Sequence, residues 1–139
     1  MKYLVDSDFL ISFSSDLDST HQKSVEIYKK IKDGSKLVAL NLVFQESTTV
    51  VSKKFGMQKA KIFYEMINKF INTRIIMNED VEKEAWKMFL QQSKKGTSFI
   101  DCANLAAYKK YKLDGILSFD EFYSKHKITY PKDARINLV

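Results

Sequence analysis

Residues 2–11 read KYLVDSDFLI, and this stretch decides the fold. The β-favouring run at residues 2–5 ends abruptly in the acidic group Asp6-Ser7-Asp8. The apolar residues Phe9, Leu10 and Ile11 follow at once, with no room for a long loop. The stretch therefore predicts a buried strand, an acidic turn and then a helix.

The rest of the chain continues this alternation. Further strands are predicted over residues 37–40, 74–77 and 116–118, and residues 131–139 suggest a weak final strand or tail. Helices are predicted over residues 21–33, 41–56, 58–72, 78–92 and 99–112, with caps at Ser19 (in a capping box with Gln22), Asn41, Asn78 and Ser98. Strands that alternate with helices form right-handed crossovers. We therefore expect a three-layer α/β/α fold with a mostly parallel central sheet.

Composition limits what the chain can be. Its 139 residues are 45% hydrophobic and 29% charged, with four Gly and one Pro, which predicts a single domain over residues 1–139. One cysteine, Cys102, excludes an internal disulfide and multi-cysteine metal motifs. No apolar run is long enough to span a bilayer, so the sequence predicts a cytoplasmic protein without a membrane segment. The formal net charge of +6 suggests a polyanionic partner.

Four acidic residues occupy related positions in this predicted pattern. Asp6 follows the first strand and Asp120 the fourth, while Glu46 lies in the helix after the second strand. Asp101 opens the helix before the fourth strand, and it reaches the same edge if the loop at residues 94–97 crosses back. Ligands of open parallel sheets bind beyond the carboxyl ends of the strands. The sequence thus predicts a cluster of carboxylates at that edge.

Such a cluster is unfavourable unless its charge is compensated. Neighbouring carboxylates repel each other and raise each other's pKa, and a hard divalent cation relieves this repulsion. An all-oxygen set without His or Cys favours Mg²⁺ or Mn²⁺, whose coordination substrate phosphate oxygens commonly complete. Lysine pairs on the predicted surface suit a nucleic-acid backbone, and the pair Lys94-Lys95 beside Asp101 is our preferred RNA contact.

Four segments carry a family resemblance that covers nearly the whole chain. They are VDSDFLIS at residues 5–12, FQES at 44–47, TSFIDCANLAAYKKY at 97–111 and ILSFDEF at 116–122. Together they resemble the four-acid pattern of PIN domains, particularly the VapC-like toxin ribonucleases. The resemblance implies a small α/β/α endoribonuclease that uses Mg²⁺ or Mn²⁺, forms a homodimer and is neutralised by an antitoxin protein. Many members carry a further acid after the last one, but Glu121 stands at a different offset and is not counted.

The resemblance also suggests roles for individual residues. Asp6, Asp101 and Asp120 would hold the cation, and Glu46 would orient the attacking water or complete the outer shell. Ser118, two residues before the last acid, would hydrogen-bond a ligand carboxylate and fix its direction.

Other interpretations remain open at this point. The opening DxD motif also begins haloacid-dehalogenase-like phosphatases, with Asp6 as nucleophile and Asp8 as acid. That family requires Ser or Thr where this chain has Asn41, and it requires a closing acidic pair that residues 116–122 lack. A receiver domain fits less well, and a PIN-like scaffold that binds RNA or protein without cutting is a non-enzymatic alternative. We interpret Asp8 as a helix N-cap and Cys102 as a buried apolar residue.

Overall fold

A computed structural model describes residues 1–31 and 33–125 of the chain. The predicted strand or tail at residues 131–139 lies outside the described residues. The elements, in chain order, are β1 (Lys2–Val5), α1 (Ser7–Ser14), α2 (His21–Lys30), β2 (Lys36–Leu40), α3 (Asn41–Phe55), α4 (Met57–Phe70), β3 (Thr73–Ile75), α5 (Glu79–Leu90), α6 (Phe99–Lys110), β4 (Gly115–Leu117) and α7 (Glu121–Lys125). None of the described helices is long and apolar enough to cross a membrane.

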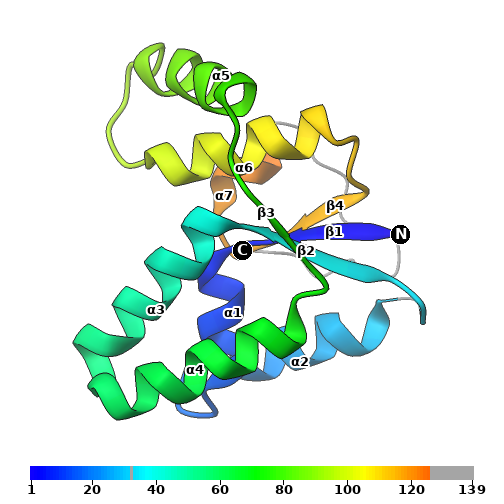
Figure 1. The fold of residues 1–139 in the computed structure, drawn as a ribbon, viewed down its shortest axis with the longest axis vertical. Helices are drawn as coiled ribbons and strands as arrows, with labels where there is room; N and C mark the ends of the chain where they lie inside the picture. Colours follow the sequence, from blue (N-terminus) through cyan, green and yellow to red (C-terminus); the bar gives the residue numbers. More distant parts are fainter. Residues whose placement is uncertain (32, 126–139) are drawn as a thin grey trace.

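The four strands form one sheet in the order β3-β2-β1-β4. All three strand pairs are parallel, and β1 is central: Tyr3 pairs with Leu37 of β2 on one side and with Gly115 of β4 on the other. Helices α1 to α4 lie on one side of the sheet, and α5, α6 and α7 lie on the other (Figure 1). The predicted three-layer α/β/α architecture is therefore confirmed.

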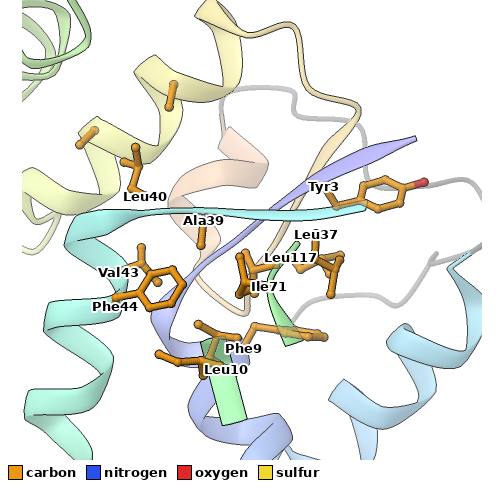
Figure 2. Packing of buried hydrophobic residues seen from close by; sticks show 14 of the residues in the cluster. Tyr3, Phe9, Leu10, Leu37, Ala39, Leu40, Val43, Phe44, Ile71 and Leu117 are labelled. Carbon is orange, nitrogen blue, oxygen red and sulfur yellow. The ribbon is translucent and has the colours of Figure 1, made fainter. Parts of the chain in front are cut away.

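Alternate residues of the strands pack against the two helical layers. Tyr3, Val5 and Ala39 belong to a large buried cluster that includes side chains of α1, α3 and α4 and extends to α5 and α6 (Figure 2). The intervening residues of the same strands join a second cluster that includes α6 and α7, namely Leu4, Val38 and Ile116 with Leu105 and Tyr123. A parallel sheet buried on both faces requires such continuous apolar strands. This two-sided core fixes the position of β1, and hence of the residues that follow it.

Two of the predicted helix caps are confirmed, and two are wrong. The side chains of Asn78 and Ser98 accept hydrogen bonds from the third backbone N–H groups of α5 and α6. Asn41 is already inside α3, and its side chain accepts a hydrogen bond from the Met77 N–H at 3.1 Å, so a tertiary contact replaces the cap. The residue before α2 is Thr20 rather than Ser19, and its hydroxyl bonds to Asp18 instead of the helix.

The buried packing of α6 generates a stability prediction. Leu105 in α6 is fully buried, whereas Leu90 at the end of α5 is 74% exposed. We expect Leu105→Ala to lower the free energy of unfolding by about 2–5 kcal/mol, because it removes core atoms and leaves a cavity. The matched surface variant Leu90→Ala should change it by less than about 0.5 kcal/mol. Urea denaturation followed by circular dichroism measures both, and equal losses would contradict the described packing.

Candidate functional site

The acidic residues gather where the strand order reverses. Chain order runs outward from β1 through β2 to β3, and β4 then returns to the other side of β1. Asp6 directly follows β1, and Ser118 directly follows β4, so both lie at the carboxyl ends of adjacent parallel strands. The Asp6 N–H donates to the Leu117 carbonyl at 3.0 Å and continues the pairing of the two strands. Open α/β sheets bind their ligands at such a switch point.

Asp6 is the most enclosed acid of the site. Its side chain is 4% exposed, and both carboxylate oxygens accept hydrogen bonds. Oδ1 accepts from the Ser7 N–H at 2.8 Å and from the Asn104 amide at 3.1 Å, while Oδ2 lies 3.0 Å from the Ser118 hydroxyl. Asp6 is also the N-cap of α1, which places its carboxylate at the positive end of that helix.

Asp8 belongs to the same cluster, so our interpretation of it as a helix N-cap is wrong. The cap position is taken by Asp6, and Asp8 lies in the first turn of α1. Its carboxylate accepts from the Phe119 N–H at 3.0 Å, and each of its oxygens lies 3.2 Å from the Ser118 hydroxyl. Ser118 has a single proton and can donate it to Asp6 or to Asp8, but not to both at once. The two carboxyl groups therefore compete for one donor.

The first turn of α6 brings Asp101 to the same edge. Asp101 and Ser98 form a capping box, in which the Ser98 N–H donates to the Asp101 carboxylate at 3.0 Å and the Ser98 hydroxyl accepts from the Asp101 N–H at 3.2 Å. Its other oxygen faces the Tyr123 hydroxyl at 3.5 Å. This capping box is a structural reason for an acid at this position, and it orients one oxygen while the other faces the site.

The two remaining acids, Asp120 and Glu46, follow the strands on either side of β1. Asp120 follows β4; its N–H donates to Ser118 at 3.0 Å, and its carboxylate accepts from the Phe122 N–H at 2.9 Å. Glu46 lies in α3, where it is half-buried, and burial together with the charge of Asp101 raises the pKa of Glu46. The Ser7 hydroxyl opposes this rise, although it forms no hydrogen bond of ordinary geometry.

The site concentrates acidic side chains, and no basic side chain of the described residues forms an ion pair with them. Burial, and then the charges of Asp8 and Asp101, raise the pKa of Asp6 to about 8. Burial raises the pKa of Asp8 to about 6, with a smaller contribution from Asp120, and burial also raises the pKa of Asp101. Within residues 1–31 and 33–125 the ion pair found joins Lys110 to Asp80, away from this cluster. The carboxylates thus repel one another inside a protein of net charge +6.

The donor set matches a hard divalent cation in its chemistry. Every candidate ligand is an oxygen, and two polar atoms in or beside the cluster, Ser7 Oγ and Asn104 Oδ1, are buried without a hydrogen-bond partner in the described part of the chain. The side chains as they stand do not form a closed ligand set: among the described residues no three His, Cys, Asp or Glu groups are close enough to hold an ion. Coordination would require the carboxylates to move inward.

Two uncharged residues of the site escaped the sequence-based prediction. Asn104 and Tyr123 are both fully buried, and the Asn104 amide donates to Asp6 and to the Tyr123 hydroxyl. Asn104 had a detectable signal, because it is the one polar residue within the otherwise apolar stretch 102–107 of this helix. Tyr123 had none, since the direction of its hydroxyl depends on how α7 packs.

The predicted RNA contacts lie in the connection that leads to Asp101. Lys94 and Lys95 are both exposed in the turn between α5 and α6. This turn lies at the same end of the molecule as the start of α3, which follows the carboxyl end of β2 (Figure 1). Neither lysine forms an ion pair with a described acidic residue. Their charges are therefore exposed on the connection that precedes Asp101.

Comparison with known proteins gives a result from structure but none from sequence. No family model and no curated protein sequence matches the chain. Among solved structures, the chain is similar to Mycobacterium tuberculosis VapC20, described as a sarcin–ricin-loop-cleaving toxin, with a TM-score of 0.80 and 17% identity over 91% of this chain and 96% of that one. The chain has the fold of a VapC toxin. It also matches a chain of the VapBC-1 structure from nontypeable Haemophilus influenzae, with a TM-score of 0.69 and 12% identity over 97% of this chain and 100% of that one. The predicted resemblance to VapC-like PIN domains is therefore confirmed for the fold.

The raised pKa values of Asp6 and Asp8 predict a pH dependence of stability in metal-free protein. An aspartate of the unfolded chain ionises near pH 4, as a rough reference, whereas Asp8 and Asp6 keep their protons up to about 6 and about 8 in the native state. Between these values the native state binds more protons than the unfolded state, so the free energy of unfolding falls as the pH rises. This contribution is fully present below about pH 4 and is lost by about pH 8.

The variant Asp6→Asn isolates this effect because its amide cannot ionise. We expect the stability difference between Asp6→Asn and wild type to shift in favour of the variant as the pH rises from about 4 to about 8. Urea denaturation in the presence of EDTA across this range measures the difference. A difference that does not depend on pH would contradict the raised pKa of Asp6.

Proposed function

We propose that the chain, as a single PIN-like domain over residues 1–139, is a divalent-metal-dependent endoribonuclease and the toxin of a toxin–antitoxin pair. The observation that carries this proposal is a buried group of carboxylates, at the switch point of a VapC-type fold, without a basic partner among the described residues. Such a group requires either protons or a cation at neutral pH. The net charge of +6 on the whole chain favours a polyanionic substrate.

In this proposal Asp6, Asp101 and Asp120 hold one or two Mg²⁺ or Mn²⁺ ions. When bound there, such an ion would supply Lewis-acid chemistry to a phosphodiester and to the water that attacks it. Two hydrogen bonds orient the Asp6 carboxylate: the Ser118 hydroxyl donates to Oδ2, and the Ser7 N–H at the start of α1 donates to Oδ1. Glu46 approaches from α3, from where it would orient the attacking water. Asp8 lies beside the proposed metal ligands and competes with Asp6 for the hydrogen bond of the Ser118 hydroxyl.

The phosphatase alternative is less compatible with these contacts. Asn41, at the position where that family requires Ser or Thr, donates no hydroxyl, and its side chain is bonded to the Met77 N–H. This contact therefore disfavours the phosphatase alternative.

The proposed partners follow from the same resemblance. An antitoxin protein is supported by the likeness to a chain of the VapBC-1 structure, and an RNA substrate by the description of VapC20 as a toxin that cleaves the sarcin–ricin loop. We extend the proposal to a homodimer and to a cytoplasmic location, as the family resemblance implies.

Two aspartate variants test the metal-nuclease proposal. Asp6→Asn and Asp101→Asn keep the volume of the side chain and remove its charge, so each should lower RNA cleavage in Mn²⁺ by at least about 100-fold, more than loss of an outer-shell partner. Asp33→Asn, an exposed acid between α2 and β2, is the matched control and should cleave normally. Incubation with total RNA and sequencing of the fragments gives both rate and cleavage sites. Near-normal cleavage by both site variants would end the proposal.

The lysine pair is tested by the salt dependence of binding. In a cleavage-deficient Asp101→Asn background, Lys94→Ala combined with Lys95→Ala should weaken RNA binding and reduce the slope of log K against log salt by up to about 1.4, near 0.7 per single-strand phosphate contact. Lys29→Ala combined with Lys30→Ala, at the end of α2, is the control pair. Fluorescence anisotropy with labelled RNA measures the slopes, and an unchanged slope for the first pair would remove Lys94 and Lys95 from the RNA interface.

A further inference from the structure

Asn104 and Tyr123 form an uncharged bridge between two of the acids. The Asn104 amide nitrogen lies 3.1 Å from Asp6 Oδ1 and 3.0 Å from the Tyr123 hydroxyl, which in turn faces Asp101 Oδ1 at 3.5 Å. Both side chains are fully buried. The bridge thus connects the acid after β1 with the acid of α6, and it runs through α7, the helix that follows Asp120.

The hydrogen bonds of the bridge run from Asn104 to Asp6 and, through the Tyr123 hydroxyl, toward Asp101. The Tyr123 hydroxyl accepts from the Asn104 amide, and its one proton faces the carboxylates of Asp101 and Asp6. The two amide hydrogens of Asn104 are then used by Asp6 and by Tyr123, while its Oδ1 has no partner among the described residues. The reverse orientation of the amide would set its oxygen against the Asp6 carboxylate, with two acceptors facing each other.

The lack of charge on Asn104 and Tyr123 matters for cation binding. A lysine or arginine at either position would hold the carboxylates as well, but it would cancel their charge and compete with a divalent cation. The remaining contacts of these acids are also uncharged: the backbone N–H groups of Ser7 and Ser98 and the Ser118 hydroxyl. The described hydrogen bonds therefore fix these acids in place without a basic side chain that would compete with a cation.

We propose that Asn104 and Tyr123 are positioning residues, which set the distance between the Asp6 and Asp101 carboxylates without adding a positive charge that would compete with a divalent cation. This inference rests on the proposed function, because it concerns the same site. It goes further by assigning two residues that are not acids, do not contact substrate and act through the acids they touch.

The test measures Mn²⁺ binding directly, by isothermal titration calorimetry on the full-length protein. Tyr123→Phe removes one hydroxyl and keeps the ring, and Asn104→Leu removes both amide donors at similar volume. Each should weaken Mn²⁺ binding by about 10–100-fold, the range found for outer-shell partners of metal ligands. Tyr108→Phe, in the same helix as Asn104 but outside the bridge, should bind Mn²⁺ as wild type does.

A second readout separates positioning from a general loss of structure. With the RNA concentration varied at a fixed, subsaturating Mn²⁺ concentration, both bridge variants should lower kcat and leave KM for RNA unchanged, and added Mn²⁺ should restore part of the rate. Mn²⁺ affinity equal to wild type in folded Tyr123→Phe and Asn104→Leu would overturn the bridge while leaving the nuclease proposal intact. Wild-type protein that binds no Mn²⁺ would overturn both.

Discussion

Uncompensated negative charge at the carboxyl end of β1 is the constraint on which the site depends. Asp6 is buried there beside Asp8 and Asp101, in a protein whose overall charge is +6. Backbone N–H groups, the hydroxyls of Ser118 and Tyr123 and the Asn104 amide hold these acids, and no basic side chain of the described residues forms an ion pair with them. Burial without a counter-charge is unfavourable, so the folded protein takes up either protons or a cation. A metal-dependent nuclease uses that requirement for its chemistry.

The sheet topology explains why acids so distant in sequence meet. Strands β2 and β3 lie on one side of β1, and β4, the last strand in the chain, pairs with its other side. Residues near positions 6 and 120 are therefore neighbours. Helix α6 begins at the same edge, and its capping box places Asp101 there. The helical layers buried against the two faces of β1 hold this arrangement. The same architecture appears in VapC20 at 17% identity, which indicates that burial pattern and topology, rather than particular core residues, specify the fold.

Much of the fold could be predicted from sequence, whereas the contacts within the site could not. Strand ends and the caps at Asn78 and Ser98 are local signals, so the edge that carries Asp6, Asp101 and Asp120 was predictable. The predicted cap at Asn41 was wrong because its side-chain oxygen accepts a hydrogen bond from the Met77 N–H, which is distant in sequence. The predicted cap at Asp8 was wrong because β1 ends at Val5, which makes Asp6 the residue before the helix. The bridge from Asn104 to Tyr123 depends on the packing of α6 against α7, which no local pattern encodes.

Anomalous diffraction from crystals grown with Mn²⁺ near neutral pH tests the central claim most directly, because it locates the ion without reference to activity. The account predicts a Mn²⁺ peak in direct contact with Asp6 and at least one of Asp101 and Asp120, with these side chains drawn closer together than in the metal-free state. Well-ordered crystals with no Mn²⁺ at this edge of the sheet, or with a lysine or arginine side chain paired to Asp6 in its place, would contradict it.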